Sequence, residues 1–155
     1  MTQGLPALIR HRGEGRTLPL PTGRVTFTAT TADTGGRFEL YELDLDPDQR
    51  PLRRHVHQQM EEMIIVVDGE LDAVVGERQM RLQAGSTLFI PRGQPHAWAN
   101  RGRSSATVLL HYTPSGQREQ YFERMARLLG GSLPPTQAQL DDLARRFDEQ
   151  PIDDE

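Results

Sequence analysis

Three histidines and one glutamate in the middle of the chain have the side-chain types of a metal centre. His55 and His57 are two residues apart, Glu62 opens an apolar run over residues 63–67, and His96 follows a Pro-x-Gly turn. Residues i and i+2 of a β-strand point to the same face, so the first two imidazoles would reach into one space. Imidazole nitrogens and a carboxylate oxygen are ligands that suit divalent first-row metals.

A neighbouring glutamate competes with Glu62 for this role. A carboxylate in apolar surroundings is costly unless it is paired, hydrogen-bonded or bound to a metal. Glu62 opens the apolar run, so we expect it to be the ligand, and we expect Glu61 to lie in a solvated turn. The alternative to a metal centre is a metal-free ligand pocket, because a buried histidine often has only a structural hydrogen bond.

Two motifs around these residues resemble those of the cupin family. The first family motif is Gly, five residues, His-x-His, three or four residues, Glu, six residues, Gly. This chain matches it from His55 to Gly69, but Gln49 stands where the opening glycine would be. The second motif is Gly, five residues, Pro-x-Gly, two residues, His, three residues, Asn, and the chain matches it fully from Gly85 to Asn100. The resemblance covers the middle third of the chain.

The resemblance implies a jelly-roll β-barrel in which His55, His57, Glu62 and His96 bind one divalent transition metal: iron, nickel, manganese, cobalt or zinc. Among cupins the chain is most similar to small quercetin 2,3-dioxygenase-like proteins, which implies an enzyme that uses O2 to cleave a flavonol-like or enolic aromatic substrate. In that group the glutamate is also the general base, and we expect the apolar strand to raise the pKa of Glu62 toward working pH.

Two other functions fit the same scaffold, because a fold does not determine an activity. Similar small cupins act as non-redox polyketide cyclases or isomerases, and some cupins only bind small molecules. Substrate contacts are expected from Trp98, which has the strand parity of His96 and a flat ring for stacking, and from His111 at the end of the last strand. Core packing for Trp98 and a partly exposed strand end for His111 are the alternatives.

The rest of the chain predicts an all-β barrel followed by helices. Short alternating or apolar segments separated by glycine-rich turns predict strands over the ranges 24–31, 37–45, 52–57, 62–67, 70–75, 78–82, 87–90, 96–100 and 106–112. The apolar run 62–67 predicts a strand buried on both faces. We therefore expect residues 24–113 to form the barrel, and we expect the turn 33–36 to join its first two strands.

The two ends of the chain have a different character. Residues 1–23 are rich in Gly, Pro and Arg, which predicts an irregular arm that is partly disordered or packs on a partner subunit. Residues 114–155 predict one or two helices and an acidic tail. The first helix carries the apolar stripe 121–129 and stops at Gly130, and the second begins with a Thr136–Gln139 capping box and ends at Pro151. The apolar stripes are expected to cover the barrel or form a homodimer surface.

Composition excludes several classes of function. The net charge of −4 gives no electrostatic support for a nucleic-acid partner. The chain has no cysteine, which excludes disulfides, thiolate metal sites and a cysteine nucleophile. No apolar run is long enough to span a bilayer, and the first sixteen residues do not have the pattern of a signal peptide. We expect a cytoplasmic protein with a small-molecule substrate and no membrane partner.

Overall fold

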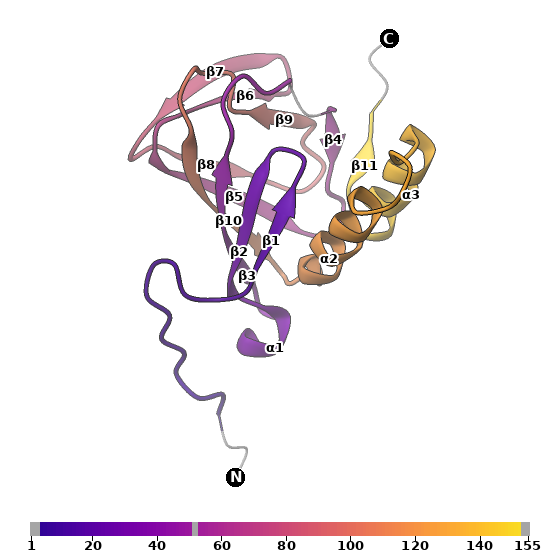
Figure 1. Ribbon diagram of the computed structural model, residues 1–155. Coiled ribbons are helices and arrows are strands. Elements are labelled where there is room, and N and C mark those ends of the chain that lie inside the picture. Colours follow the sequence, from indigo (N-terminus) through magenta and orange to yellow (C-terminus); the bar gives the residue numbers. More distant parts are fainter. Residues whose placement is uncertain (1–3, 51–52, 153–155) are drawn as a thin grey trace.

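Two antiparallel β-sheets pack face to face and form a jelly roll, with helices at one end (Figure 1). The computed structural model describes residues 4–50 and 53–152. The six-stranded sheet has the order β1 (Thr17–Leu20), β2 (Gly23–Ala29), β3 (Glu39–Leu45), β10 (Ala106–Thr113), β5 (Glu61–Asp68), β8 (Thr87–Ile90). The five-stranded sheet has the order β11 (Gln150–Pro151), β4 (His55–Val56), β9 (His96–Ala99), β6 (Glu70–Val75), β7 (Arg78–Gln83). The predicted all-β jelly roll with C-terminal helices is confirmed.

The period-2 pattern of the central strands builds the core between the sheets. In β3 the side chains of Tyr41, Leu43 and Leu45 are buried while the residues between them are not. In β5 the same alternation buries Ile64 and Val66. The prediction that β5 is buried on both faces is wrong, because no described helix covers the outer face of the six-stranded sheet, and Val67 is exposed there.

A glycine closes the first motif because the backbone requires one. Gly69 turns the chain from β5 into β6 with a φ of 75°, which an L side chain rarely adopts. A Cβ atom at this position would also lie 2.7 Å from the carbonyl oxygen of Ser105. The spacing from Glu62 to Gly69 is thus fixed by the length of one strand and the turn that ends it.

Two helices follow β10 and lie against one end of the jelly roll (Figure 1). Helix α2 (Arg118–Leu129) buries Phe122 against Tyr41, with ring centroids 4.9 Å apart. Helix α3 (Gln137–Arg146) begins with the predicted capping box, in which Thr136 accepts from the Gln139 N–H. It ends before Phe147, so Pro151 does not terminate it: residues 150–151 form β11, which pairs with β4.

The N-terminal segment is more ordered than predicted. Residues 17–20 form β1, which pairs with β2, so the irregular arm ends earlier than residue 23. The turn predicted at 33–36 is a short helix, α1 (Thr31–Thr34), because the Asp33 carboxylate accepts from the Thr30 N–H and starts a helical turn. The strand predicted over residues 52–57 is shorter than expected: β4 covers only His55–Val56, so His57 follows the strand. Residues 1–3, 51–52 and 153–155 lie outside the described residues. Among the described residues, no helix is both long and apolar enough to cross a membrane.

Candidate metal centre

Three strands bring the four predicted ligands together in the core. His55 lies on β4 and pairs in register with His96 on β9, while Glu62 lies on β5 of the facing sheet. One ligand atom from each of His55, His57, Glu62 and His96 lies within 4.8 Å of the others. All four side chains are buried, so the sequence-based choice of Glu62 over Glu61 is supported by the geometry.

Each of the three imidazole rings is fixed in its own orientation by a backbone carbonyl. The Nδ1 atom of His55 lies 3.0 Å from the Arg53 carbonyl oxygen, and that of His96 lies 2.8 Å from the Gln94 carbonyl oxygen. The Nδ1 atom of His57 lies 2.6 Å from the Asp148 carbonyl oxygen. A carbonyl only accepts, so each Nδ1 carries its proton and each Nε2 is the nitrogen left to bind a metal.

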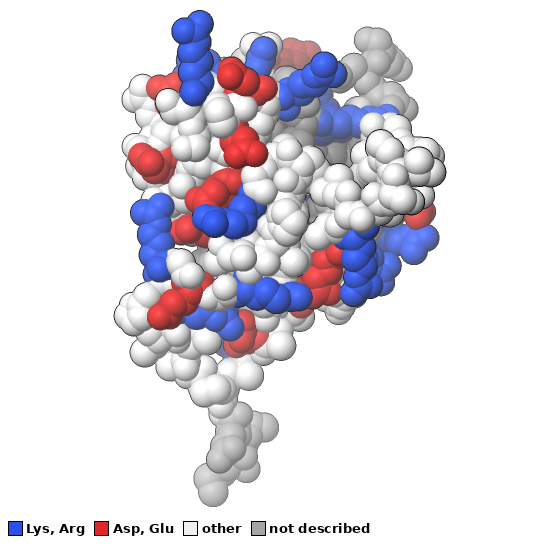
Figure 2. Space-filling view, in the orientation of Figure 1, with Lys and Arg blue, Asp and Glu red and all other residues white. Residues whose placement is uncertain are grey.

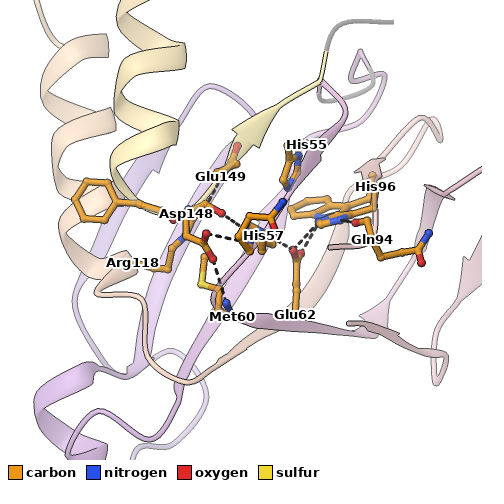
Figure 3. A network of polar contacts seen from close by, with 12 residues as sticks. His55, His57, Met60, Glu62, Gln94, His96, Arg118, Asp148 and Glu149 are labelled. Carbon is orange, nitrogen blue, oxygen red and sulfur yellow. Dashed lines mark hydrogen bonds and ion pairs between the residues drawn. The ribbon is translucent and has the colours of Figure 1, made fainter. Parts of the chain in front are cut away.

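The Glu62 carboxylate points toward His57 and His96 (Figure 3). Its Oε2 lies 3.0 Å from His57 Nε2 and 2.9 Å from His96 Nε2, and its Oε1 accepts from Trp98 Nε1–H at 2.9 Å. Burial alone would raise the pKa of Glu62, but the contacts with His57 and His96 lower this pKa well below its usual value. The expectation of a raised pKa is therefore wrong for the metal-free cluster, because the neighbouring imidazoles outweigh the apolar strand.

The arrangement fits a bound cation. With Nδ1 protonated, a neutral imidazole presents its Nε2 lone pair, and two such lone pairs face the same Glu62 oxygen. These acceptors are compatible only if the imidazoles carry an extra proton or a cation lies between them. Three nitrogen donors and one carboxylate are a ligand set for a divalent first-row metal, and four protein ligands leave positions for a small molecule.

Electrostatics differ among the histidines of the cluster. Burial lowers the pKa of His55. Burial also acts to lower the pKa of His96, but its hydrogen bond with the Glu62 carboxylate outweighs this and leaves the pKa raised. Glu62 thus favours a positive charge on the His96 side of the cluster, which is the charge that a metal ion would supply.

A hollow adjoins the cluster on the side of His55 and Trp98. Its volume is about 120 Å³, and its wall includes the apolar residues Leu43 and Leu110 of the barrel and Tyr121 of α2. A wider hollow of about 410 Å³ also borders His55 and Tyr121 and extends toward α3. Trp98 thus faces the site, as its parity predicted, and its indole N–H is used to hold Glu62.

His111 does not join the cluster. It lies on β10 between Leu110 and Tyr112, which are buried, so its ring points to the opposite face of the sheet. There it stacks on Phe38 with ring centroids 5.4 Å apart, and burial lowers its pKa. The adjacent Tyr112 is the residue of β10 that faces the centre, 5.8 Å from the His57 ring.

Three residues of the C-terminal extension, by which we mean the segment after residue 113, border the site without having been predicted. The buried guanidinium of Arg118 lies 2.8 Å from a Glu149 carboxylate oxygen and over the Tyr121 ring, and Asp148 contacts His57. Burial would raise the pKa of Glu149, but the electrostatic interactions with His55 and Arg118 lower it to about 2. Arg118 and Asp148 lie outside both motifs, at the ends of predicted helices, and carry no spacing signal that reveals their partners.

The substitution at the start of the first motif is explained by the structure. Gln49 takes the place of the glycine and links the loop to the end of the second motif. Its backbone N–H donates to the Asn100 carbonyl at 2.9 Å, and its side-chain oxygen accepts from the Asn100 N–H at 3.2 Å. Asn100 in turn fixes the following turn by donating to the Ser104 carbonyl and accepting from the Gly102 N–H.

Comparisons with known proteins agree with this geometry. The family described as "Cupin domain" matches residues 41–112, the part of the chain that runs from β3 to β10. Quercetin 2,3-dioxygenase of Bacillus subtilis (strain 168) is 34% identical over 113 residues, which cover 72% of this chain and 32% of that protein. The chain therefore aligns with about a third of that relative's length.

Two further similar proteins are a polyketide synthase protein and a polyketide cyclase. The tetracenomycin polyketide synthase protein TcmJ of Streptomyces glaucescens is 27% identical over 110 residues, covering 71% of this chain and 68% of that protein. The polyketide cyclase RemF of Streptomyces resistomycificus has the same fold, with a TM-score of 0.61 at 22% identity, over 71% of this chain and 81% of RemF. With its two motifs, its jelly roll and these relatives, the chain belongs to the cupin superfamily.

Proposed function

We propose that this cupin is a metal-dependent dioxygenase that acts on a flavonol-like or enolic aromatic substrate. The observation that carries the proposal is the convergence of four buried donor atoms beside a hollow lined by aromatic and aliphatic side chains. The relative of 34% identity, a quercetin 2,3-dioxygenase, supports the choice of reaction. The partners of the reaction would be a small molecule and O2.

The chain's own residues have defined roles in this proposal. His55, His57, His96 and Glu62 would hold one divalent ion of iron, nickel, manganese, cobalt or zinc, of which the first four suit O2 chemistry. When bound, the metal would supply a Lewis acid that favours the ionised form of a chelating substrate hydroxyl. The apolar wall of the hollow would exclude water and align a flat ring, with Trp98 and Tyr121 at its sides.

Glu62 is the proposed general base. Its carboxylate is ionised because its pKa is low, and it lies at the inner end of the hollow that Trp98 borders. To take a proton from the substrate hydroxyl, the Glu62 carboxylate would give up one of its present contacts with His57 and His96. The indole N–H of Trp98 holds one carboxylate oxygen in place, which leaves Oε2 as the oxygen whose contacts change.

A non-redox cyclase or isomerase of a polyketide intermediate is the second candidate. It is favoured by the likeness to TcmJ, which extends over 68% of that protein's length. In this case the metal would polarise a carbonyl, and no O2 would be consumed. The same hollow and the same four ligands would be used, so the two candidates differ in the metal that is needed and in the co-substrate.

Metal content and O2 uptake together test the proposal. The purified protein is analysed for metals and then assayed in an O2 electrode with flavonols and other polyphenols. The dioxygenase proposal expects iron, nickel, manganese or cobalt and substrate-dependent O2 uptake that Glu62→Gln abolishes while some metal remains. Zinc with product formation but without uptake would support the cyclase, and unchanged turnover of Glu62→Gln would exclude Glu62 as the base.

A homodimer is proposed on a different surface from the helical stripes that the sequence suggested. The stripe of α2 packs on the barrel through Phe122, whereas the outer face of the six-stranded sheet exposes Phe38, Val67 and Phe89. In register, Phe89 pairs with Met63, which extends this apolar face across β5. Exposed apolar side chains on one face of a sheet are typical of a protein contact, and we propose a second copy of the chain as the occupant of this face.

The absence of a nucleic-acid partner stays a prediction, which rests on the net charge of −4. Figure 2 shows acidic and basic side chains interspersed on the visible face instead of gathered by sign. A cytoplasmic location stays a prediction, which the absence of cysteine supports.

A further inference from the structure

The chain after α3 returns to the metal centre. Residues 147–152, which we call the C-terminal clamp, run beside β4, and β11 within the clamp pairs with it (Figure 1). Pro151 lies opposite His55 in this register, and the Ile152 N–H donates to the Arg54 carbonyl at 2.8 Å. The edge of the five-stranded sheet that carries the first histidine is therefore paired with the C-terminal end of the described chain.

Asp148 makes the closest contacts of the clamp with the site (Figure 3). Its carboxylate accepts from three consecutive backbone N–H groups, those of Gln58, Gln59 and Met60, at 2.9, 2.8 and 3.0 Å. Its own carbonyl oxygen lies 2.6 Å from His57 Nδ1. One residue thus holds the ring of a ligand and also the loop that follows this ligand.

The loop held by Asp148 links two of the four ligands. Residues 58–60 are the path from His57 to β5, which carries Glu62 as its second residue. Consecutive N–H groups that point to one carboxylate form an anion-binding nest, and filling it fixes the backbone of the loop. Asp148 is held with a φ of 60°, an uncommon conformation for a residue other than glycine, so its position is specified by its surroundings.

A salt bridge attaches the clamp to the rest of the extension. Glu149 pairs with Arg118 at 2.8 Å, and a second guanidinium nitrogen of Arg118 donates to the Phe147 carbonyl at 3.3 Å. Arg118 is buried at the start of α2, so the clamp is joined to both helices and to the site. All of these residues lie outside the region 41–112 that matches the cupin family.

We propose that Asp148 is a positioning residue of the metal centre and that the C-terminal clamp sets the affinity of the site. The carbonyl of Asp148 keeps the proton of His57 on Nδ1, and its carboxylate holds the loop that spaces His57 from Glu62. Hydrogen-bond partners of metal ligands fix the tautomer and the ring orientation, and their loss weakens metal binding about 10- to 100-fold. The inference rests on metal binding by the site, but not on which reaction the site catalyses.

Cobalt binding to the metal-stripped full-length chain tests the proposal. Co²⁺ is titrated into the wild type, Asp148→Ala and Asp148→Asn, and both the dissociation constant and the visible absorption spectrum are measured. Asp148→Ala removes the acceptor of three N–H groups, so we expect about 10- to 100-fold weaker binding and a changed spectrum. Asn tolerates a positive φ and keeps one oxygen, so Asp148→Asn should lie between the other two proteins.

Asp48 provides a matched control. It has a φ of 56°, is exposed and lies in the loop before the first motif, so Asp48→Ala makes the same chemical change in the same backbone conformation. This variant should bind Co²⁺ as the wild type does. A weakening of the same size in Asp48→Ala would show that the effect is one of charge or backbone strain, and it would overturn the proposal.

The state of His57 gives a second measurement that folding alone would not change. Proton NMR of the metal-stripped wild type should show a downfield, exchange-protected ring N–H from the short contact with Asp148. Asp148→Ala keeps the backbone carbonyl but releases the loop 58–60 that follows His57, so we expect this signal to shift while circular dichroism stays that of a folded chain. If Asp148→Ala does not fold, Asp148→Asn tests the proposal instead, and we expect it to bind Co²⁺ about tenfold more weakly than the wild type does.

The possible failures are distinguishable. Binding of Co²⁺ to Asp148→Ala and Asp148→Asn within twofold of the wild type, with the same spectrum, would overturn the clamp and leave the metal centre intact. A wild type that binds no Co²⁺ and no other divalent transition metal would overturn both. Weaker binding of Asp148→Ala with unchanged O2 uptake at saturating metal would support the clamp and show that it acts on affinity.

Discussion

The pair of carboxylates that anchors α2 to the barrel makes the stability of this protein depend on pH. Glu39 is fully buried at the start of β3, and Glu119 lies in the first turn of α2. The hydroxyl of Tyr41 lies between them, 2.8 Å from Glu39 and 3.1 Å from Glu119. Burial, and then the hydrogen bond shared with Glu119, raise the pKa of Glu39 to about 7.

The sign and the size of the effect follow from this pKa. An unfolded chain has an ordinary Glu39 pKa of 4.5, so the folded state keeps a proton there that the unfolded state releases. The stabilisation is fully present below pH 4.5 and is lost as the pH rises to about 7. At about 1.4 kcal/mol per pH unit, the loss across this window is about 3 kcal/mol. Glu119, whose pKa is lowered, is ionised in both states above about pH 6, so its stabilising contribution does not change with pH there.

The substitution Glu119→Gln tests this reasoning. A glutamine can donate to the Glu39 carboxylate and still accept from Tyr41, so the pKa of Glu39 should be raised less in the variant. Urea unfolding of the metal-stripped protein is measured between pH 5 and pH 8. We expect the free energy of unfolding to fall less with pH in the variant, so that the variant gains about 1 kcal/mol or more on the wild type by pH 8.

The comparison is made as a difference between two proteins so that the histidine titrations, which both share, cancel. Glu123→Gln is the control, because it removes a carboxylate from the same helix that pairs with Arg16 and does not contact Glu39. Its free energy of unfolding should run parallel to that of the wild type. Parallel curves for wild type and Glu119→Gln over the whole range would refute the shared proton.

Three further outcomes are expected. His57→Ala and His96→Ala should each lose most of the bound metal, because each removes one of four ligands, whereas the exposed His11→Ala should not; full metal content in both would refute the ligand assignment. Trp98→Phe removes the hydrogen bond to Glu62 Oε1, which should lower the free energy of unfolding by about 1–3 kcal/mol, measured by urea titration, and an unchanged value would show that water replaces the indole. Phe89→Lys should shift a micromolar dimer toward monomer in sedimentation velocity, and a wild type that is already monomeric would exclude the proposed face.

Local patterns were sufficient to predict which four side chains converge in the core. The two-residue spacing was enough to expect His55 and His57 in one space, although β4 ends at Val56 and His57 lies just after it. The six residues between Glu62 and Gly69 complete β5 and lead to its turn. Glu62 was chosen over Glu61 because it opens the apolar run and keeps the six-residue spacing to Gly69, and in the structure it shares the inward parity of Ile64 and Val66. The expectation of a solvated turn at Glu61 was wrong, because Glu61 is the first residue of β5. Most of the core strands and the capping box of α3 were predictable for the same reason: each depends on residues close together in the sequence.

The parts of the site that were missed depend on distant contacts. Asp148 reaches the loop after His57 across about ninety positions, through a two-residue strand that has no periodic pattern of its own. His111 was expected near the site from its place at a strand end, but its register, opposite Met63 and Leu40, turns it to the outer face. Parity along β10 would have placed it there, since Leu110 and Tyr112 are the apolar inward positions.

In the proposed function, residues outside the two motifs contribute to the choice of substrate. The motifs supply the ligands, but the hollow beside them is also bordered by Pro21 of the turn between β1 and β2 and by Tyr121 and Met125 of α2. These residues lie outside the region 41–112 that matches the cupin family. A relative that shares the four ligands but differs at these positions would present the same metal to a different molecule. Exchange of Tyr121 and Met125, with the ligands left intact, is therefore the change that should alter substrate preference while metal content stays constant.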